Sequence, residues 1–283
     1  MFEVKFANMH LHSTYSDGGF TPNQLVLIGK SVGYGALVLT DHETDAGNAA
    51  FARAAKREGI ETLTGVEFYG QVNGVAVHLT ALDFDPDEPT LRAFIKKRCD
   101  LQYERTKKIT EMGIANGFLG ELTWNDVVDV APEGAWLCID SVLTAIRVKK
   151  KIPPQGTGGI RANVFKTPEA KALKAPSPEA EEVISVVRKA GGVIALAHPS
   201  EKTLQQLDAL VSLGLNGIET DHPDVLSEHA LAARQAAEQY RLYACGGTDH
   251  TGPMSACSGK YAIPAFHGIT EEQFFTLKER RLG

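Results

Sequence analysis

Two stretches of this chain alternate short apolar segments with amphipathic helical segments, and this alternation constrains the fold more than any other feature. The apolar segments predict strands at 4–12, 36–40, 61–68, 75–82, 193–197, 217–220 and 242–245. The segments between and after them predict helices at 21–32, 45–58, 91–115, 178–190, 203–213, 227–240 and 270–280. Alternating strands and helices favour an α/β fold with a parallel sheet, either open or closed into a barrel.

The middle of the chain does not follow this rhythm. From 116 to 178 the pattern is irregular, and it includes Pro132, a run of three lysines at 149–151 and the pair Pro153-Pro154. We interpret this region as an insertion between the two alternating stretches. The sequence therefore predicts a discontinuous main domain over residues 1–89 and 177–283, and an inserted small helical subdomain over residues 90–176.

Composition and charge disfavour several classes of protein. The chain has 283 residues, a formal net charge of −6 and four cysteines, none of them in a Cys-x-x-Cys pair. An acidic balance disfavours stable binding to nucleic acid or to an anionic membrane. No stretch reaches the roughly 20 apolar residues of a membrane span, and residues 1–8 carry no signal-peptide pattern. We expect a protein of the reducing cytoplasm.

Histidines and carboxylates gather where the predicted strands end. His10 and His12 are two residues apart on the first strand, so both rings point to one face and can bind one metal ion. The carboxyl ends of parallel strands meet at one rim, where α/β barrels build active sites. Further candidate ligands at or after strand positions are Asp17, His42, Glu67, His78, His198, Asp249 and His250. Nitrogen and oxygen donors of this kind suit two or three divalent ions.

Each of these residues has an ordinary structural explanation when it is taken alone. A pair of histidines two residues apart is weak evidence for a ligand pair, and a single histidine such as His78 is typical of a sheet edge. Asp17 fits a turn residue, and Glu67 fits a solvated strand end. Their convergence on one predicted rim makes a metal site the better interpretation.

Seven short motifs resemble the polymerase and histidinol phosphatase (PHP) superfamily, and most of all its stand-alone metal-dependent phosphoesterases. They are Met9-His10-Leu11-His12-Ser13, Asp17-Gly18, Thr40-Asp41-His42, Gly65-Val66-Glu67, Val77-His78-Leu79, Ala197-His198-Pro199 and Thr248-Asp249-His250. They occur in the order of the family, and the resemblance covers residues 5–83 and 177–251.

The resemblance implies a distorted (β/α)7 TIM-like barrel with two or three Mn, Fe or Zn ions, which hydrolyses phosphate monoesters or diesters. The ligands that it implies are His10, His12, Asp17, His42, Glu67, His78, His198 and Asp249. It also implies that Glu67 bridges two ions, and that the inserted helical subdomain covers the site.

The last motif departs from the family, which usually has Asp-x-His at this point. Asp249 and His250 are adjacent, and neighbours on a regular strand point to opposite faces. Both can bind metal only if the chain turns here, which Thr251-Gly252-Pro253 permits. We keep His250 as a candidate ligand, and its loss would leave two ions instead of three.

The insert departs from the family as well. Related phosphoesterases usually carry an Arg-x-His element at the start of an insert helix, whereas this chain has Ile139-Asp140-Ser141-Val142, whose acid repels a phosphate. Replacement substrate-binding cations are Arg161, whose planar guanidinium grips phosphate with two hydrogen bonds, and Lys166. The alternative for each is a surface charge. Trp124 and Trp136 are expected to fill the small core of the insert, with stacking on a nucleobase as the alternative.

These residues predict metal-assisted hydrolysis of a small phosphorylated metabolite or nucleotide by metal-bound hydroxide. Asp249 is the first candidate for the catalytic proton carrier, and His222, at another predicted strand end, is the second. One alternative is a metal-dependent hydrolase of a non-phosphate substrate, similar to the amidohydrolases. The other is a non-catalytic PHP module that binds metal, against which the intact ligand set argues.

Overall fold

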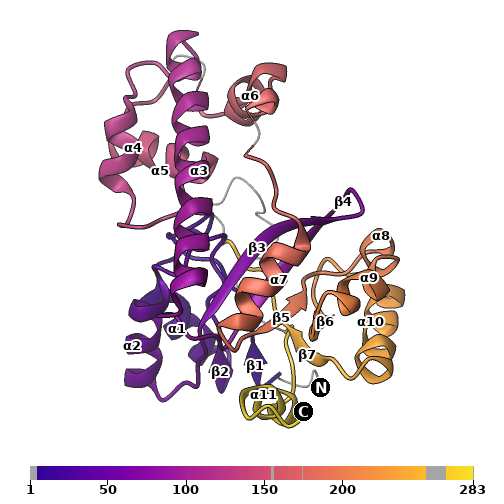
Figure 1. Cartoon of the computed structure of the whole chain (residues 1–283). Helices are drawn as coiled ribbons and strands as arrows, with labels where there is room; N and C mark the ends of the chain where they lie inside the picture. Colours follow the sequence, from indigo (N-terminus) through magenta and orange to yellow (C-terminus); the bar gives the residue numbers. More distant parts are fainter. Residues whose placement is uncertain (1–4, 154–155, 174, 253–265, 283) are drawn as a thin grey trace.

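The computed structural model describes residues 5–153, 156–173, 175–252 and 266–282. These residues form an α/β fold whose strands lie in two sheets (Figure 1). In the smaller sheet, β1 (Ala7–Asn8) pairs in parallel with β2 (Ala36–Leu37). The larger sheet has the strand order β3 (Gly65–Val72), β4 (Val75–Leu82), β5 (Val193–Leu196), β6 (Gly217–Asp221) and β7 (Tyr243–Gly246). Each strand overlaps one of the predicted apolar segments.

The larger sheet is mixed, so the prediction of a parallel sheet is wrong at one strand. β4 runs antiparallel to both β3 and β5. The cause is the two-residue turn Asn73-Gly74, in which both residues have positive φ, 50° and 74°. Asn-Gly between two apolar strands favours a hairpin, because this turn matches the twist of the strands. The reversal brings His78 beside the end of β5, where its carbonyl accepts a hydrogen bond from the amide of Ala197 at 3.0 Å.

Isolated bridges connect the ends of the two sheets. They join Ala36 to Glu61 and His42 to Glu67 on one side, and Leu11 to His250 on the other. No closed sheet forms within the described residues, so the structure shows a mixed α/β fold without a complete seven-stranded barrel.

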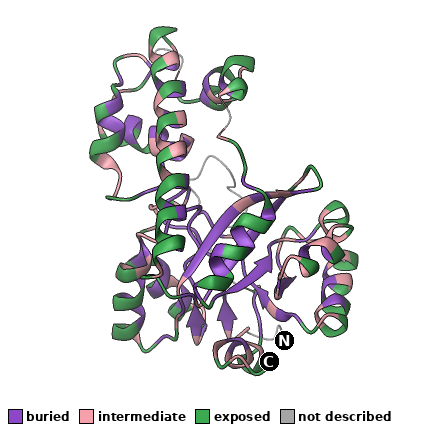
Figure 2. Ribbon diagram, viewed as in Figure 1, coloured by how far each residue is buried: buried purple, intermediate pink, exposed green. Residues whose placement is uncertain are grey.

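Helices pack on the sheets, and their outer faces are exposed whereas the strands are buried (Figure 2). The helices outside the insert are α1 (Pro22–Ser31), α2 (Asn48–Glu58), α7 (Ala180–Lys189), α8 (Glu201–Leu204), α9 (Leu207–Ser212), α10 (Ser227–Gln239) and α11 (Glu271–Lys278). The single helix predicted over 203–213 is therefore two short helices. Thr21 caps α1 through its hydroxyl, which accepts the amide of Gln24, and Gly59 ends α2 with a φ of 68°. No helix among the described residues is long and apolar enough to cross a membrane.

A long helix, α3 (Pro89–Ala115), links two hydrophobic cores. Its first turns place Phe94 against Phe68 of β3, with ring centroids 5.5 Å apart, in the core beneath α7. Its later part contributes Ile109 to a separate core between 109 and 173. That core is closed by α4 (Trp124–Val130), α5 (Ile139–Val148), the π-helical turn η1 (Arg161–Phe165) and α6 (Pro168–Ala172).

Candidate metal centre

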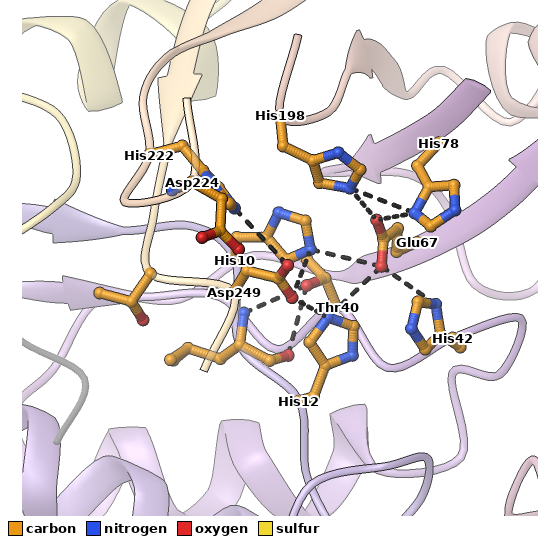
Figure 3. A network of polar contacts seen from close by, with 12 residues as sticks. His10, His12, Thr40, His42, Glu67, His78, His198, His222, Asp224 and Asp249 are labelled. Carbon is orange, nitrogen blue, oxygen red and sulfur yellow. Dashed lines mark hydrogen bonds and ion pairs between the residues drawn. The ribbon is translucent and has the colours of Figure 1, made fainter. Parts of the chain in front are cut away.

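Every strand delivers at least one polar side chain to a single cluster (Figure 3). The contributing residues are His10 and His12 after β1, His42 after β2, Glu67 on β3, His78 on β4, His198 after β5, His222 after β6 and Asp249 after β7. The side chains come together because five strands present their ends, and β3 and β4 their first halves, to one edge.

The buried carboxylate of Glu67 lies at the centre of the cluster, and its two oxygens face different histidines. Oε2 lies 3.0 Å from His42 Nδ1, 3.3 Å from His12 Nε2 and 3.4 Å from His10 Nε2. Oε1 lies 2.9 Å from His78 Nδ1 and 3.1 Å from His198 Nε2. With one oxygen facing each of two histidine groups, this carboxylate could hold an ion on either side.

Asp249 completes the first of these groups because the chain turns at this residue, whose φ is 48°. Its Oδ1 lies 3.0 Å from His12 Nε2 and 3.7 Å from His10 Nε2, and its Oδ2 lies 3.6 Å from His222 Nε2. Gly247 permits this approach, because a Cβ there would lie 2.4 Å from the backbone nitrogen of His10.

A third group forms where the loop after β1 meets the loop after β2. Asp17 Oδ1 lies 3.6 Å from His12 Nδ1, and Asp17 Oδ2 lies 3.9 Å from His42 Nε2. Buried Asp41 holds the loop, because its carboxylate accepts hydrogen bonds from the amide and the hydroxyl of Ser13 at 2.7 and 2.6 Å. The loop thus reaches the cluster through Asp17, while Asp41 has a structural role.

Glu219 of β6 belongs to the cluster, although it was not among the predicted site residues. Its Oε1 lies 2.7 Å from His10 Nδ1, and its Oε2 accepts the backbone amide of His198 at 2.6 Å. A carboxylate on the far nitrogen of a ligating histidine fixes the ring and raises its basicity. The available signal was weak: an acid within the short apolar strand predicted over 217–220.

Several polar atoms in the cluster are buried and make no hydrogen bond within the described residues. They are His10 Nε2, His12 Nε2, His42 Nδ1, His222 Nε2 and Glu67 Oε2. Such atoms cost about 1–3 kcal/mol each unless something satisfies them. They form overlapping groups whose ligand atoms lie within 4.8 Å of one another. This mixed nitrogen and oxygen donor set fits divalent transition metals.

The charges in the cluster shift its pKa values strongly. Burial lowers the pKa of His10, but Glu219, Glu67 and Asp249 outweigh it, so that the pKa lies well above its usual value. The pKa of His12 is raised in the same way against burial, with Asp17 as the leading carboxylate. Burial raises the pKa of Glu67, yet the surrounding histidines bring it well below the usual range. A metal ion bound by His10 and His12 would therefore displace protons from them.

Three predicted site residues do not join the cluster. The ring of His250 stacks on Phe20, with centroids 5.7 Å apart, and lies outside the groups of candidate ligand atoms. The turn at Asp249, whose φ is 48°, brings Asp249 to the cluster while His250 packs against Phe20. Arg161 and Lys166 are exposed on and after η1, which packs on α3. Figure 1 shows α6, the next helix, at the far end of α3 from the sheets.

Other cations line a pocket of about 330 Å³ next to the cluster. Its walls include Glu43, Tyr69, Arg98, Arg105 and Trp136. Tyr69 and Trp136 connect it to the cluster, because their ring centroids lie 4.9 and 5.2 Å from that of His42. Trp124 lies in the insert core as expected, but Trp136 does not, so that half of the tryptophan prediction is wrong.

The comparisons with known proteins agree with this geometry. The sequence profile described as the PHP domain matches residues 8–123. This part of the chain, somewhat less than half of it, is therefore similar to the PHP domain. It is 27% identical to a phosphoribosyl 1,2-cyclic phosphate 1,2-diphosphodiesterase of Eggerthella lenta, over 87% of this chain and 94% of that protein. It is also 27% identical to a 3′,5′-nucleoside bisphosphate phosphatase of Chromobacterium violaceum, over 87% of each protein.

The fold of this chain also occurs among solved structures. One similar structure, from Bifidobacterium adolescentis and assigned as a metal-dependent phosphoesterase, has a TM-score of 0.78 and 24% identity. The match covers 99% of this chain and 98% of that one. At 24% identity this similarity shows a shared fold alone, and it extends over 99% of the chain, including the insert.

Proposed function

We propose that this PHP protein is a metal-dependent phosphoesterase that hydrolyses a small phosphorylated metabolite or nucleotide. The observation that carries the proposal is the bridging position of Glu67, whose oxygens face two separate groups of histidines. Relatives named as a cyclic phosphate diphosphodiesterase and a bisphosphate phosphatase align over most of the chain and support phosphate ester chemistry.

We infer two or three ion positions from the overlapping groups of ligand atoms. The first would be held by His10, His12, Glu67 and Asp249, and the second by Glu67, His78 and His198. A third would be held by His12, Asp17 and His42. Mn, Fe or Zn suits these imidazole and carboxylate donors. His250 is not part of this set.

Divalent ions held by these residues would supply an activated water and would neutralise charge on the phosphoryl oxygens. Side chains of the protein handle the protons of the reaction. Asp249 is ionised at neutral pH, because His10, His12 and His222 outweigh the opposing effect of burial on its pKa. It therefore accepts a proton instead of donating one.

His222 is suited to donate a hydrogen bond to the leaving oxygen. Its Nδ1 accepts the amide of Asp224 at 3.0 Å, so the neutral ring carries its proton on Nε2. That nitrogen faces the cluster, 3.6 Å from Asp249 Oδ2. Asp249 is then the proton acceptor, and His222 keeps its proton while it hydrogen-bonds the leaving oxygen.

We also infer that the seven strands close into the distorted (β/α)7 barrel of the family, and that residues 90–176 form the insert that covers its mouth. The isolated bridges Ala36 to Glu61 and Leu11 to His250 support closure, because they lie between the two sheets. Trp136, from the segment before α5, lies against His42 and supports coverage by the insert.

The experiment combines elemental analysis with a substrate panel. The purified protein is loaded with Mn²⁺ and assayed with p-nitrophenyl phosphate, bis-p-nitrophenyl phosphate, nucleotides and p-nitrophenyl acetate. We expect at least two bound ions for every chain and hydrolysis of phosphate esters alone. Hydrolysis of the acetate alone would establish the amidohydrolase-like alternative, and metal binding without any turnover would indicate a non-catalytic module.

A further inference from the structure

The pocket lined by Arg98, Arg105, Tyr69 and Trp136 contains two cations that differ in their partners. Arg98 is buried, and its Nε and Nη2 donate to Glu43 Oε1 and Oε2 at 2.8 and 3.1 Å. Its Nη1 donates to Pro176 O at 2.7 Å. Arg98 is therefore fully engaged, and its charge is neutralised by Glu43.

Arg105 lies seven residues further along α3, about two helical turns, and so on the same face. It is partly buried, and no hydrogen bond or ion pair engages its guanidinium within the part of the chain that the structure describes. The pocket thus keeps one positive charge that no residue in its wall balances.

Trp136 supplies a second donor without an acceptor. The residue is 8% exposed, and its Nε1 is buried without a hydrogen bond among the described residues. An unsatisfied buried N–H is costly, so a ligand acceptor at this place is stabilising. The rings of Trp136 and Tyr69 stack directly, with centroids 5.9 Å apart, and leave no room for a nucleobase between them.

We propose that this pocket binds a second anionic group of the substrate, a phosphate or a carboxylate, while the scissile phosphate lies at the metal centre. The proposal rests on the proposed phosphoesterase function and narrows the substrate class to small organic phosphates with two anionic groups. Arg105 binds the second group by charge-assisted hydrogen bonds, and the indole N–H of Trp136 contributes a neutral one. Both aromatic rings contact His42, so the pocket lies directly beside the metal centre. A small molecule can therefore place one anionic group in the pocket and the other at the metal centre.

Matched substrates test this proposal, since each pair differs in one anionic group. Glycerol 2-phosphate is compared with 2-phosphoglycerate for a carboxylate, and fructose 6-phosphate with fructose 1,6-bisphosphate for a phosphate. We expect kcat/KM to be at least about tenfold higher for one or both doubly anionic members, and the responding pair identifies the second group. In Arg105→Ala this preference falls by about tenfold or more, mainly through KM, and Arg105→Lys restores part of it.

Lys108→Ala is the matched control, because Lys108 is an exposed cation on the same helix outside the pocket. We expect it to keep the wild-type preference. Equal kcat/KM within both pairs, or an equal loss for both members in Arg105→Ala, would overturn the anion pocket and leave the phosphoesterase function intact.

A binding measurement separates the pocket from the activity. The chain has two tryptophans, so in Trp124→Phe the fluorescence reports from Trp136 alone. We expect inorganic phosphate, titrated in the presence of EDTA, to change this fluorescence, and Arg105→Ala to abolish the change. Binding with no turnover of any phosphate ester would support the pocket and refute the proposed function, whereas no fluorescence change would count against the pocket.

Discussion

The metal centre and the insert are stabilised in different ways. The metal centre takes its side chains from strands that are far apart in the sequence, and the buried charges of Glu67 and Glu219 hold them together. The insert folds from neighbouring helices around an apolar core, with local caps such as Thr123 at the start of α4. Changing one charge should therefore disable the centre without unfolding the chain, whereas a change in the insert should affect stability more than metal binding.

Glu67→Gln is expected to have the largest effect. The amide keeps the size of the side chain but removes the charge that faces both histidine groups. We expect loss of bound metal and a fall in activity of at least about 10²–10³-fold, the range for loss of one preorganised electrostatic contact. Elemental analysis and initial rates measure both. Glu61→Gln is the control, because Glu61 is an exposed acid just before the same strand, and full metal content in Glu67→Gln would refute the bridging role.

Glu219→Gln should have a smaller effect on the same centre. The amide oxygen can still accept the amide of His198, but the carboxylate no longer supports His10 Nδ1. Loss of such a supporting partner costs about 10–100-fold in metal affinity or activity. A competition titration with a metal chelator measures the affinity, with exposed Glu238→Gln as the control. Unchanged affinity in Glu219→Gln would show that His10 needs no carboxylate partner.

Metal affinity should rise with pH. The raised pKa values of His10 and His12 contribute stability to the metal-free protein that is complete below about pH 6.5 and lost as the pH passes the raised values. The same protons compete with metal, so affinity increases about tenfold per pH unit for each proton displaced. Mn²⁺ titrations between pH 6 and 8 measure this slope. A flat profile would mean that the histidines are already neutral before metal binds.

The sequence allowed prediction of the strands and of most candidate ligands, because both follow from local patterns. His10 and His12 are fixed by the period of a strand, and Asp249 by its place after β7. The sheet direction at β4 was missed because the Asn73-Gly74 turn was not recognised as a hairpin. Arg161 was misplaced for a different reason: no local pattern reveals which face of the insert meets the sheets. Glu219 and Arg105 become visible only when distant segments pack together.

Thr123→Ala should have the smallest effect, and it tests whether the insert is stabilised independently of the metal centre. The Thr123 hydroxyl caps α4 by accepting the amide of Asp126, at 3.2 Å. Loss of such a cap costs about 1 kcal/mol in the free energy of unfolding. Denaturant unfolding measures that loss, and we expect metal content to stay at the wild-type value because the cap contacts no residue of the cluster. A matching loss of metal would mean that the insert and the strand ends form one cooperative unit, and that the two regions are not stabilised independently.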